Sequence, residues 1–160
     1  MGQWLIKSEP GAFSFDDLLK AKDRTTVWDG VRNYQARNFI RDGMKVGDKV
    51  LYYHSSTAQP GVVGIAEVAS EPYADPSQFD PKSRYFDPKS TPEQPRWFTV
   101  DVRGVEPLPR TVTLAEMKEE SSLAGLKLVQ RGSRLSVMPV SGPEYRKILA
   151  MARKEAPAAG

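Results

Sequence analysis

The chain has 160 residues, the length of one ordinary domain, and 39% of them are hydrophobic against 27% charged, a balance typical of a folded globular protein rather than a disordered one. It contains no cysteine, which excludes disulfides, cysteine nucleophiles and cysteine-ligated metal centres. The formal net charge of +3, from 23 basic and 20 acidic residues, permits nucleic-acid binding without requiring it. We expect a single domain over residues 1–155 and a disordered tail over residues 156–160.

The N-terminal region predicts a strand followed by a helix. Residues 3–7 form a short apolar run typical of a strand, and the pair Pro10-Gly11 ends it. Ser14 stands three residues before Asp17, which is the spacing of a helix N-terminal capping box. The apolar run at the N-terminus is too short for a signal peptide or a membrane span. We therefore expect an intracellular, cytoplasmic protein.

A second helix and a pair of strands are expected next. Residues 33–41 predict a helix closed by Gly43. Residues 44–54 and 62–68 carry apolar and turn residues in the order of two neighbouring strands. Gly64 lies inside the second of these, where it indicates a bulge or a close backbone approach.

The region after these strands is rich in proline. Residues 71–96 contain six prolines, a density that argues against a helix or a central strand and predicts an exposed excursion, either an ordered lid or a mobile arm. Residues 97–105 then alternate clearly enough for a strand, with Phe98, Val100 and Val102 on one buried face.

The C-terminal third predicts two helices with a strand between them. Capping boxes at residues 113–116 and 141–144 start the helices. Residues 134–139 suit a strand that Pro139 terminates. Short strands, irregular connections and helices at the edges together favour an α+β fold, a small mixed β-barrel packed by helices, over a doubly wound parallel sheet.

Few residues suit catalysis. His54 is the only histidine, so no histidine metal cluster can form around it. Phosphate-binding loops, nucleotide-binding glycine signatures and the serine nucleophile elbow are all missing from the sequence. Glu67 and Asp101 could supply carboxylates, although strand carboxylates are common without catalysis. We therefore expect no enzyme, no catalytic residue, no metal and no cofactor.

Basic residues gather in two stretches that contain no acid, residues 32–41 and 127–134. Both stretches could face phosphates, and both could equally be solvated surfaces. The predicted phosphate contacts are Arg32, Arg37, Arg131 and Arg134. The three tryptophans, Trp4, Trp28 and Trp97, stand beside polar or charged residues; a tryptophan so placed usually lies at the edge of a core, and a minority line pockets that stack on a planar ligand.

Five blocks of sequence resemble the EVE domain family, in the order in which that family has them. They are residues 4–10 (WLIKSEP), 28–39 (WDGVRNYQARNF), 52–55 (YYHS), 61–68 (GVVGIAEV) and 134–140 (RLSVMPV). The EVE family is similar to YTH and ASCH domains within the PUA-like folds, so the resemblance implies a small β-barrel flanked by helices. It also implies a pocket that reads a modified base in nucleic acid.

The resemblance to the YTH pocket places residues 6–8 and Trp28 at this site. We assign the stacking role to Trp28 and polar reading of the base to Asn33 and Ser8, with Lys7 and Arg32 near the base or a phosphate. Asn33 could instead cap the helix that follows it, and Ser8 could close a turn. The full predicted pocket comprises Lys7, Ser8, Trp28, Asn33, Tyr34, His54 and Ser55.

Two functional hypotheses follow. The first is a non-catalytic module, a monomer, that binds DNA or RNA and holds a modified base, such as methylated cytosine or adenine, after the base leaves the stack. The second is an enzyme or processing factor that acts on a nucleotide or on RNA. The single histidine and the missing general-base pair favour the first.

Overall fold

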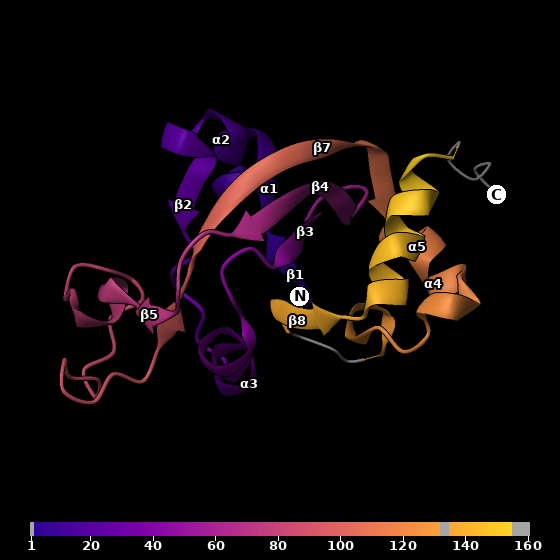
Figure 1. Ribbon diagram of the computed structural model, residues 1–160. Coiled ribbons are helices and arrows are strands. Elements are labelled where there is room, and N and C mark those ends of the chain that lie inside the picture. Colours follow the sequence, from indigo (N-terminus) through magenta and orange to yellow (C-terminus); the bar gives the residue numbers. More distant parts are fainter. Residues whose placement is uncertain (1, 132–134, 155–160) are drawn as a thin grey trace.

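The computed structural model describes residues 2–131 and 135–154 and shows a mixed α+β fold (Figure 1). Within those residues, six strands form one sheet in the order β2-β7-β4-β3-β1-β8. The sheet curls into a half-barrel with the helices at its ends and edges (Figure 1). The α+β fold expected from the sequence, a small curled sheet flanked by helices, is confirmed.

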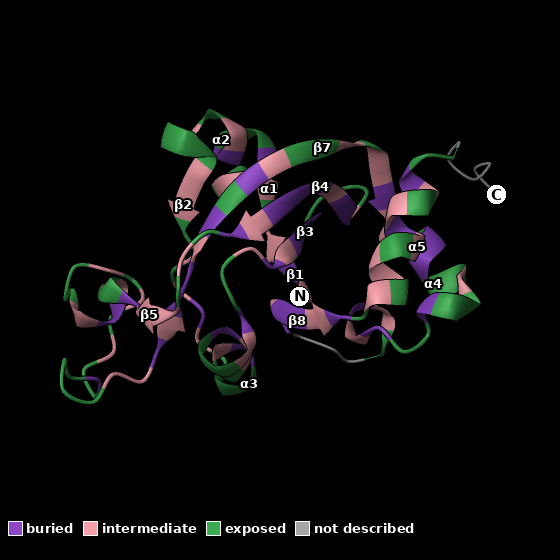
Figure 2. Cartoon of the chain, in the orientation of Figure 1, coloured by how far each residue is buried: buried purple, intermediate pink, exposed green. Residues whose placement is uncertain are grey.

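The centre of the sheet holds the core. Strands β1 (Gln3–Ser8) and β3 (Lys49–His54) pair in parallel, and β4 (Gly61–Val68) and β7 (Asp101–Thr113) continue antiparallel from β3. Most of their apolar side chains are buried, and Figure 2 shows purple bands along them. The sheet ends in β2 (Thr25–Val27) beside β7 and in β8 (Val137–Val140) beside β1.

The helices begin where their capping residues predict. Ser14, Thr113 and Ser141 each cap a helix. In each case the carboxylate of the acid three residues later accepts a hydrogen bond from the backbone N–H of the capping residue. The helices are α1 (Pro10–Phe13), α2 (Phe15–Lys20), α3 (Tyr34–Asn38), α4 (Leu114–Glu119) and α5 (Gly142–Ala152), with single turns η1 (Lys22–Arg24), η2 (Phe39–Gly43), η3 (Pro76–Phe79), η4 (Ser121–Leu123) and η5 (Lys127–Val129).

Two strand predictions need correction. Pro139 lies inside β8 and does not end it, because β8 is the last strand of the sheet and a proline there costs no ladder hydrogen bond. The strand predicted over residues 97–105 is divided: β6 (Phe98–Thr99) pairs with β5 (Tyr73–Ala74), and β7 runs on to Thr113. The pairing of β7 with β4 jumps from Val112 to Pro107, an irregularity that accommodates the prolines.

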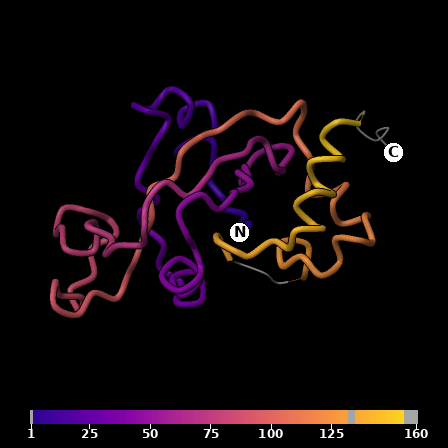
Figure 3. Tube along the Cα trace, viewed as in Figure 1, coloured from indigo at the N-terminus to yellow at the C-terminus, as the bar shows by residue number. Residues whose placement is uncertain are grey.

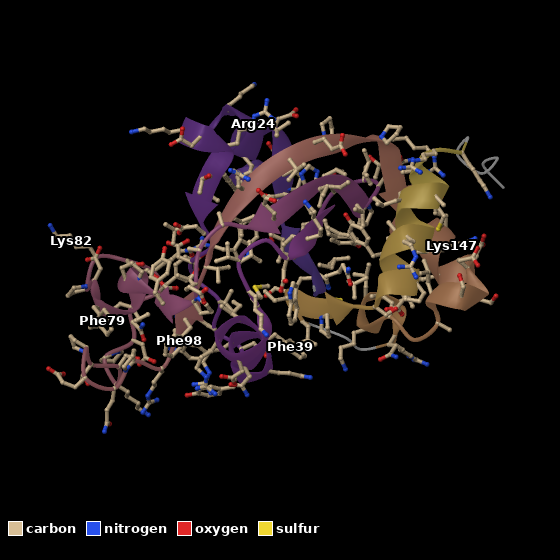
Figure 4. All side chains as sticks on the ribbon, in the orientation of Figure 1. Arg24, Phe39, Phe79, Lys82, Phe98 and Lys147 are labelled. Atoms are coloured by element: carbon tan, nitrogen blue, oxygen red, sulfur yellow. The ribbon has the colours of Figure 1, made fainter. Side chains whose placement is uncertain are left out.

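Residues 71–96, called the excursion below, leave the body of the molecule and return to it (Figure 3); Figure 4 labels Phe79 and Lys82 on this segment. The excursion is largely exposed, as expected, and it has a polar core of its own. The Gln78 amide is fully buried; it donates to the carbonyls of Asp75 and Trp97, each at 2.8 Å, and accepts from the backbone N–H groups of Arg96 and Trp97. These bonds join the two ends of the excursion and make it an ordered part of the fold.

The close approach predicted at Gly64 is present and gives a stability test. A Cβ at Gly64 would lie 2.4 Å from ring atoms of Phe15, so Gly64→Ala forces the α2 phenyl ring out of the core. We expect a loss of about 1–3 kcal/mol in the free energy of unfolding, measured by chemical denaturation. Gly11→Ala is the control, because nothing lies within 4 Å of a Cβ there. Equal stability of the two variants would contradict this packing.

Candidate functional site

A cavity of about 410 Å³ opens where β1, α1, the end of β2 and the excursion meet, a volume in the range of small-ligand pockets. It brings together three of the predicted base-binding residues, Lys7, Ser8 and Trp28. The other lining residues are Glu9, Ala12, Phe13, Thr26, Val27, Asp29, Gly30, Val31, Arg32, Arg84, Tyr85 and Ser136. We call this cavity the Trp28 pocket.

Trp28 is held in place by backbone and ring contacts. Its N–H donates to the carbonyl of Val100 at 3.0 Å, and its own carbonyl accepts from the hydroxyl of Thr99. The indole packs edge-on against Tyr52, with ring centroids 5.5 Å apart and planes at 82°. The side chain is half-buried, so the indole is fixed at its edge and part of it remains accessible at the pocket.

The turn after Trp28 requires glycine. Gly30 has φ of +86°, and a Cβ there would meet the ring of Tyr85 at 2.5 Å. The missing side chain lets the excursion approach the turn closely. Tyr85 therefore forms the far wall of the Trp28 pocket.

The carboxylate of Asp75 fixes this arrangement. It accepts from the Gly30 N–H at 2.8 Å, from the N–H and hydroxyl of Ser77, and from Arg32 at 3.2 Å. The side chain of Asp75 is 0% exposed. Burial alone would raise its pKa, but the hydrogen bonds outweigh burial and hold the pKa of Asp75 below its ordinary value.

Arg32 has a structural role that the sequence did not predict. Its five N–H groups make five hydrogen bonds, to Asp75, Ser77, the carbonyl of Val31 and, twice, the carbonyl of Tyr85. Protein acceptors thus engage every N–H group of the guanidinium. Arg32 lines the Trp28 pocket, and its contact with a phosphate stays a prediction.

A stack of aromatic rings and guanidinium groups extends from Arg32 in both directions. Its members are Arg37, Tyr34, Trp97, Arg32, Tyr85 and Arg84, with successive separations of 4.7, 4.8, 5.3, 5.5 and 4.8 Å. Such cation–π contacts are worth about 0.5–2 kcal/mol each. The stack joins α3 to the excursion and ends at the mouth of the Trp28 pocket.

Polar groups in the pocket have shifted pKa values. Burial lowers the pKa of Lys7. Asp29 is exposed at the pocket mouth, yet surrounding protein atoms displace part of its hydration and, together with the Asp75 carboxylate, raise its pKa.

The Ser8 hydroxyl donates to the carbonyl of Phe13 at 2.6 Å, which leaves its oxygen able to accept a hydrogen bond from a ligand.

Two predicted pocket residues serve local structure instead. The Asn33 side chain accepts from the Ala36 N–H at 3.0 Å and caps α3, the alternative that the sequence left open. The Nε2 atom of His54 accepts from the Phe15 N–H at 3.0 Å, at the start of α2. Burial lowers the pKa of His54, which favours the neutral ring that this acceptor role requires. Neither residue lines the Trp28 pocket.

The remaining predicted residues lie around the pocket or away from it. Tyr34 is half-exposed and stacks on Trp97, and the backbone N–H of Ser55 donates to the Ser8 carbonyl. Arg37 donates to the carbonyl of Arg96 and to the Asn38 side chain. Arg131 lines a separate cavity, and Arg134 lies outside the described residues.

Among the lining residues that sequence reasoning missed are Asp29, Arg84, Tyr85 and Ser136. Asp29 carried a signal, because it stands next to Trp28 in the second resembling block. Arg84 and Tyr85 carried none, since only the folding of the excursion brings them to the pocket. Among the described residues no cluster of side chains suits a metal ion, and no helix is long and apolar enough to cross a membrane.

Comparison with known proteins finds a family and relatives that match nearly the whole chain. The EVE domain family matches residues 2–151. Thymocyte nuclear protein 1 of Homo sapiens is 38% identical over 169 residues, covering 95% of this chain and 74% of that protein. Human THYN1, solved in complex with 5-methylcytosine-containing DNA, has a TM-score of 0.91 at 38% identity, covering 98% of this chain and 100% of that one. A Pseudomonas putida protein has a TM-score of 0.90 at 47% identity, with 94% and 99% covered.

The Asp75 tether can be tested through stability. Asp75→Asn removes the ion pair and should lower the free energy of unfolding by about 3 kcal/mol, since breaking a buried pair leaves the partner uncompensated. The wild-type advantage should shrink on acidification below the ordinary range of aspartate, because a carboxyl with a lowered folded-state pKa stabilises only while ionised. Denaturation of both proteins across pH measures this. Glu93→Gln, on an exposed part of the excursion, is the control, and equal losses in the two variants would contradict the tether.

Proposed function

This chain belongs to the EVE domain family, which confirms the resemblance seen in its sequence, and we propose that it is a non-catalytic module that binds DNA and recognises a modified cytosine extruded into the Trp28 pocket. The observation that carries the proposal is the pocket itself: a fixed, half-buried indole beside hydrogen-bonding groups from Lys7, Ser8 and Asp29. Support comes from human THYN1, which shares the fold and was solved with 5-methylcytosine DNA.

The energetics of such a pocket favour stacking as the main contribution. A base stacked on an aromatic ring gains about 1–3 kcal/mol, whereas burying one methyl group contributes about 0.8 kcal/mol. A 5-methyl group alone therefore gives a modest preference. Strong selectivity requires stacking, shape and hydrogen bonding to act on the same extruded base.

Asp29 suits the amino group of cytosine. A carboxylate accepts a hydrogen bond from the cytosine N4 amino group, whereas the O4 atom of thymine, an acceptor, would repel it. Because 5-methylcytosine and thymine share the methyl group, Asp29 would tell them apart. Its position at the pocket mouth, next to Trp28, supports this role.

The enzyme hypothesis finds less support in the same structure. Glu67 forms ion pairs with Arg103 and with Lys49, and Asp101 accepts from the hydroxyl of Tyr73. Both carboxylates bind side chains on other strands, and both lie outside the Trp28 pocket. The RNA partner, the monomeric state and the cytoplasmic location expected from the sequence stay predictions.

Trp28→Ala tests the stacking role. We expect it to weaken binding of a 5-methylcytosine strand by about 1–3 kcal/mol and to reduce the preference over unmodified cytosine, while Trp28→Phe retains part of both. Fluorescence anisotropy with labelled oligonucleotides measures the two affinities. Thermal denaturation of the same variants is the control, because truncating a purely structural tryptophan costs about 3–5 kcal/mol of stability. A strongly destabilised variant with unaltered base preference would remove Trp28 from the site.

Asp29→Ala tests the reading of the amino group. In single strands that differ only at one position, the wild type should prefer 5-methylcytosine over thymine, and the variant should lose about 1–3 kcal/mol of that preference. Asp29→Asn should also lose it, since an amide can turn to donate its N–H to the O4 atom of thymine. If the preference over thymine survives in Asp29→Ala, the amino group is read by another residue.

A further inference from the structure

A second cavity, of about 480 Å³, shares Lys7 with the Trp28 pocket. Its floor includes the buried side chains of Tyr53 and Leu128. Its rim carries Lys7, Lys118 and Arg131. We call it the Arg131 groove.

The charge of the groove has one sign. Its described lining residues include three cations and no carboxylate. Lys118 and Arg131 are both exposed, and the ion pairs found among the described residues involve six other cations, Arg32, Arg41, Lys49, Arg103, Arg110 and Lys147. The groove therefore offers positive charge to a partner rather than to its own fold.

The wall that carries Lys118 is firmly held. Lys118 belongs to α4, whose N-terminus is closed by the Thr113–Glu116 capping box. Glu116 also receives two hydrogen bonds from Arg110, both at 2.8 Å. A rigid helix presents its lysine at a defined position, which reduces the entropy lost when a ligand binds.

The groove and the Trp28 pocket are continuous through one side chain. The ammonium group of Lys7 lies 5.9 Å from the centroid of the Tyr53 ring, on the floor of the groove, and the same residue lines the base pocket. A ligand in the pocket therefore lies beside a residue that also lines the groove.

We propose that the Arg131 groove binds the sugar–phosphate backbone beside the extruded base, with Lys118 and Arg131 contacting phosphates, Tyr53 and Leu128 facing the sugar, and Lys7 bridging to the pocket. The proposal rests on the function proposed above. An apolar floor with a basic rim matches a deoxyribose phosphate, whose sugar is only weakly polar and whose phosphate is anionic. Contacts of this kind position the strand and carry no sequence information.

The test compares the double variant Lys118→Gln/Arg131→Gln with the wild type and with Lys45→Gln. Lys45 is exposed and precedes β3, at the opposite end of that strand from Tyr53, so it controls for general loss of charge. Affinity for a short duplex with one 5-methylcytosine, and for the same duplex unmodified, is measured at several salt concentrations. The double variant should bind both duplexes severalfold more weakly, with an unchanged ratio between them. Its slope of log affinity against log salt should fall by about 2, roughly 1 for each lost phosphate contact.

Failure of this proposal and failure of the proposed function give different results. A wild type that shows no preference for the methylated duplex contradicts the function of the Trp28 pocket. A wild type with that preference, together with a double variant whose salt slope matches that of Lys45→Gln, overturns the groove alone. A double variant that changes the ratio between the two duplexes also overturns it, because phosphate contacts cannot distinguish the bases.

Discussion

The ion pair between Asp75 and Arg32 is the interaction on which the candidate site depends. Asp75 comes from the excursion and Arg32 from the segment after Trp28, and the same carboxylate also holds the Gly30 N–H. The Asp75 carboxylate joins the turn and the excursion together with the two hydrogen bonds that Arg32 donates to the carbonyl of Tyr85. A buried ion pair contributes little net stability, but here it determines which two segments face each other across the pocket.

The parts of the fold that depend on neighbouring residues could be predicted from the sequence. Capping boxes at Ser14, Thr113 and Ser141 involve residues three positions apart, and all three are present. The strand at β1 follows from its local apolar run in the same way. Each of these features is decided by a few consecutive residues, and a pattern in the sequence records them directly.

Features decided by distant partners could not be predicted. The acid-free stretch around Arg32 suggested a phosphate contact, but the acid that pairs with it lies 43 residues away. The excursion looked exposed because its prolines forbid regular structure, and its buried Gln78 closes the segment through a partner 19 residues on. Pro139 was wrongly expected to end a strand, because its tolerance depends on β8 being the last strand of the sheet.

Affinity and specificity are physically separate on this surface. Exposed cations such as Arg131 act through charge that salt screens, and they attract any phosphate backbone equally. In the proposed function the Trp28 pocket acts at short range on a base that has already left the stack, and its groups are partly desolvated, which lowers the pKa of Lys7. Extruding a base costs free energy, and contacts in the pocket offset this cost only after the base has entered it. A binder of this design therefore needs backbone contacts next to the pocket, because they hold the strand while the base is exchanged between the stack and the indole.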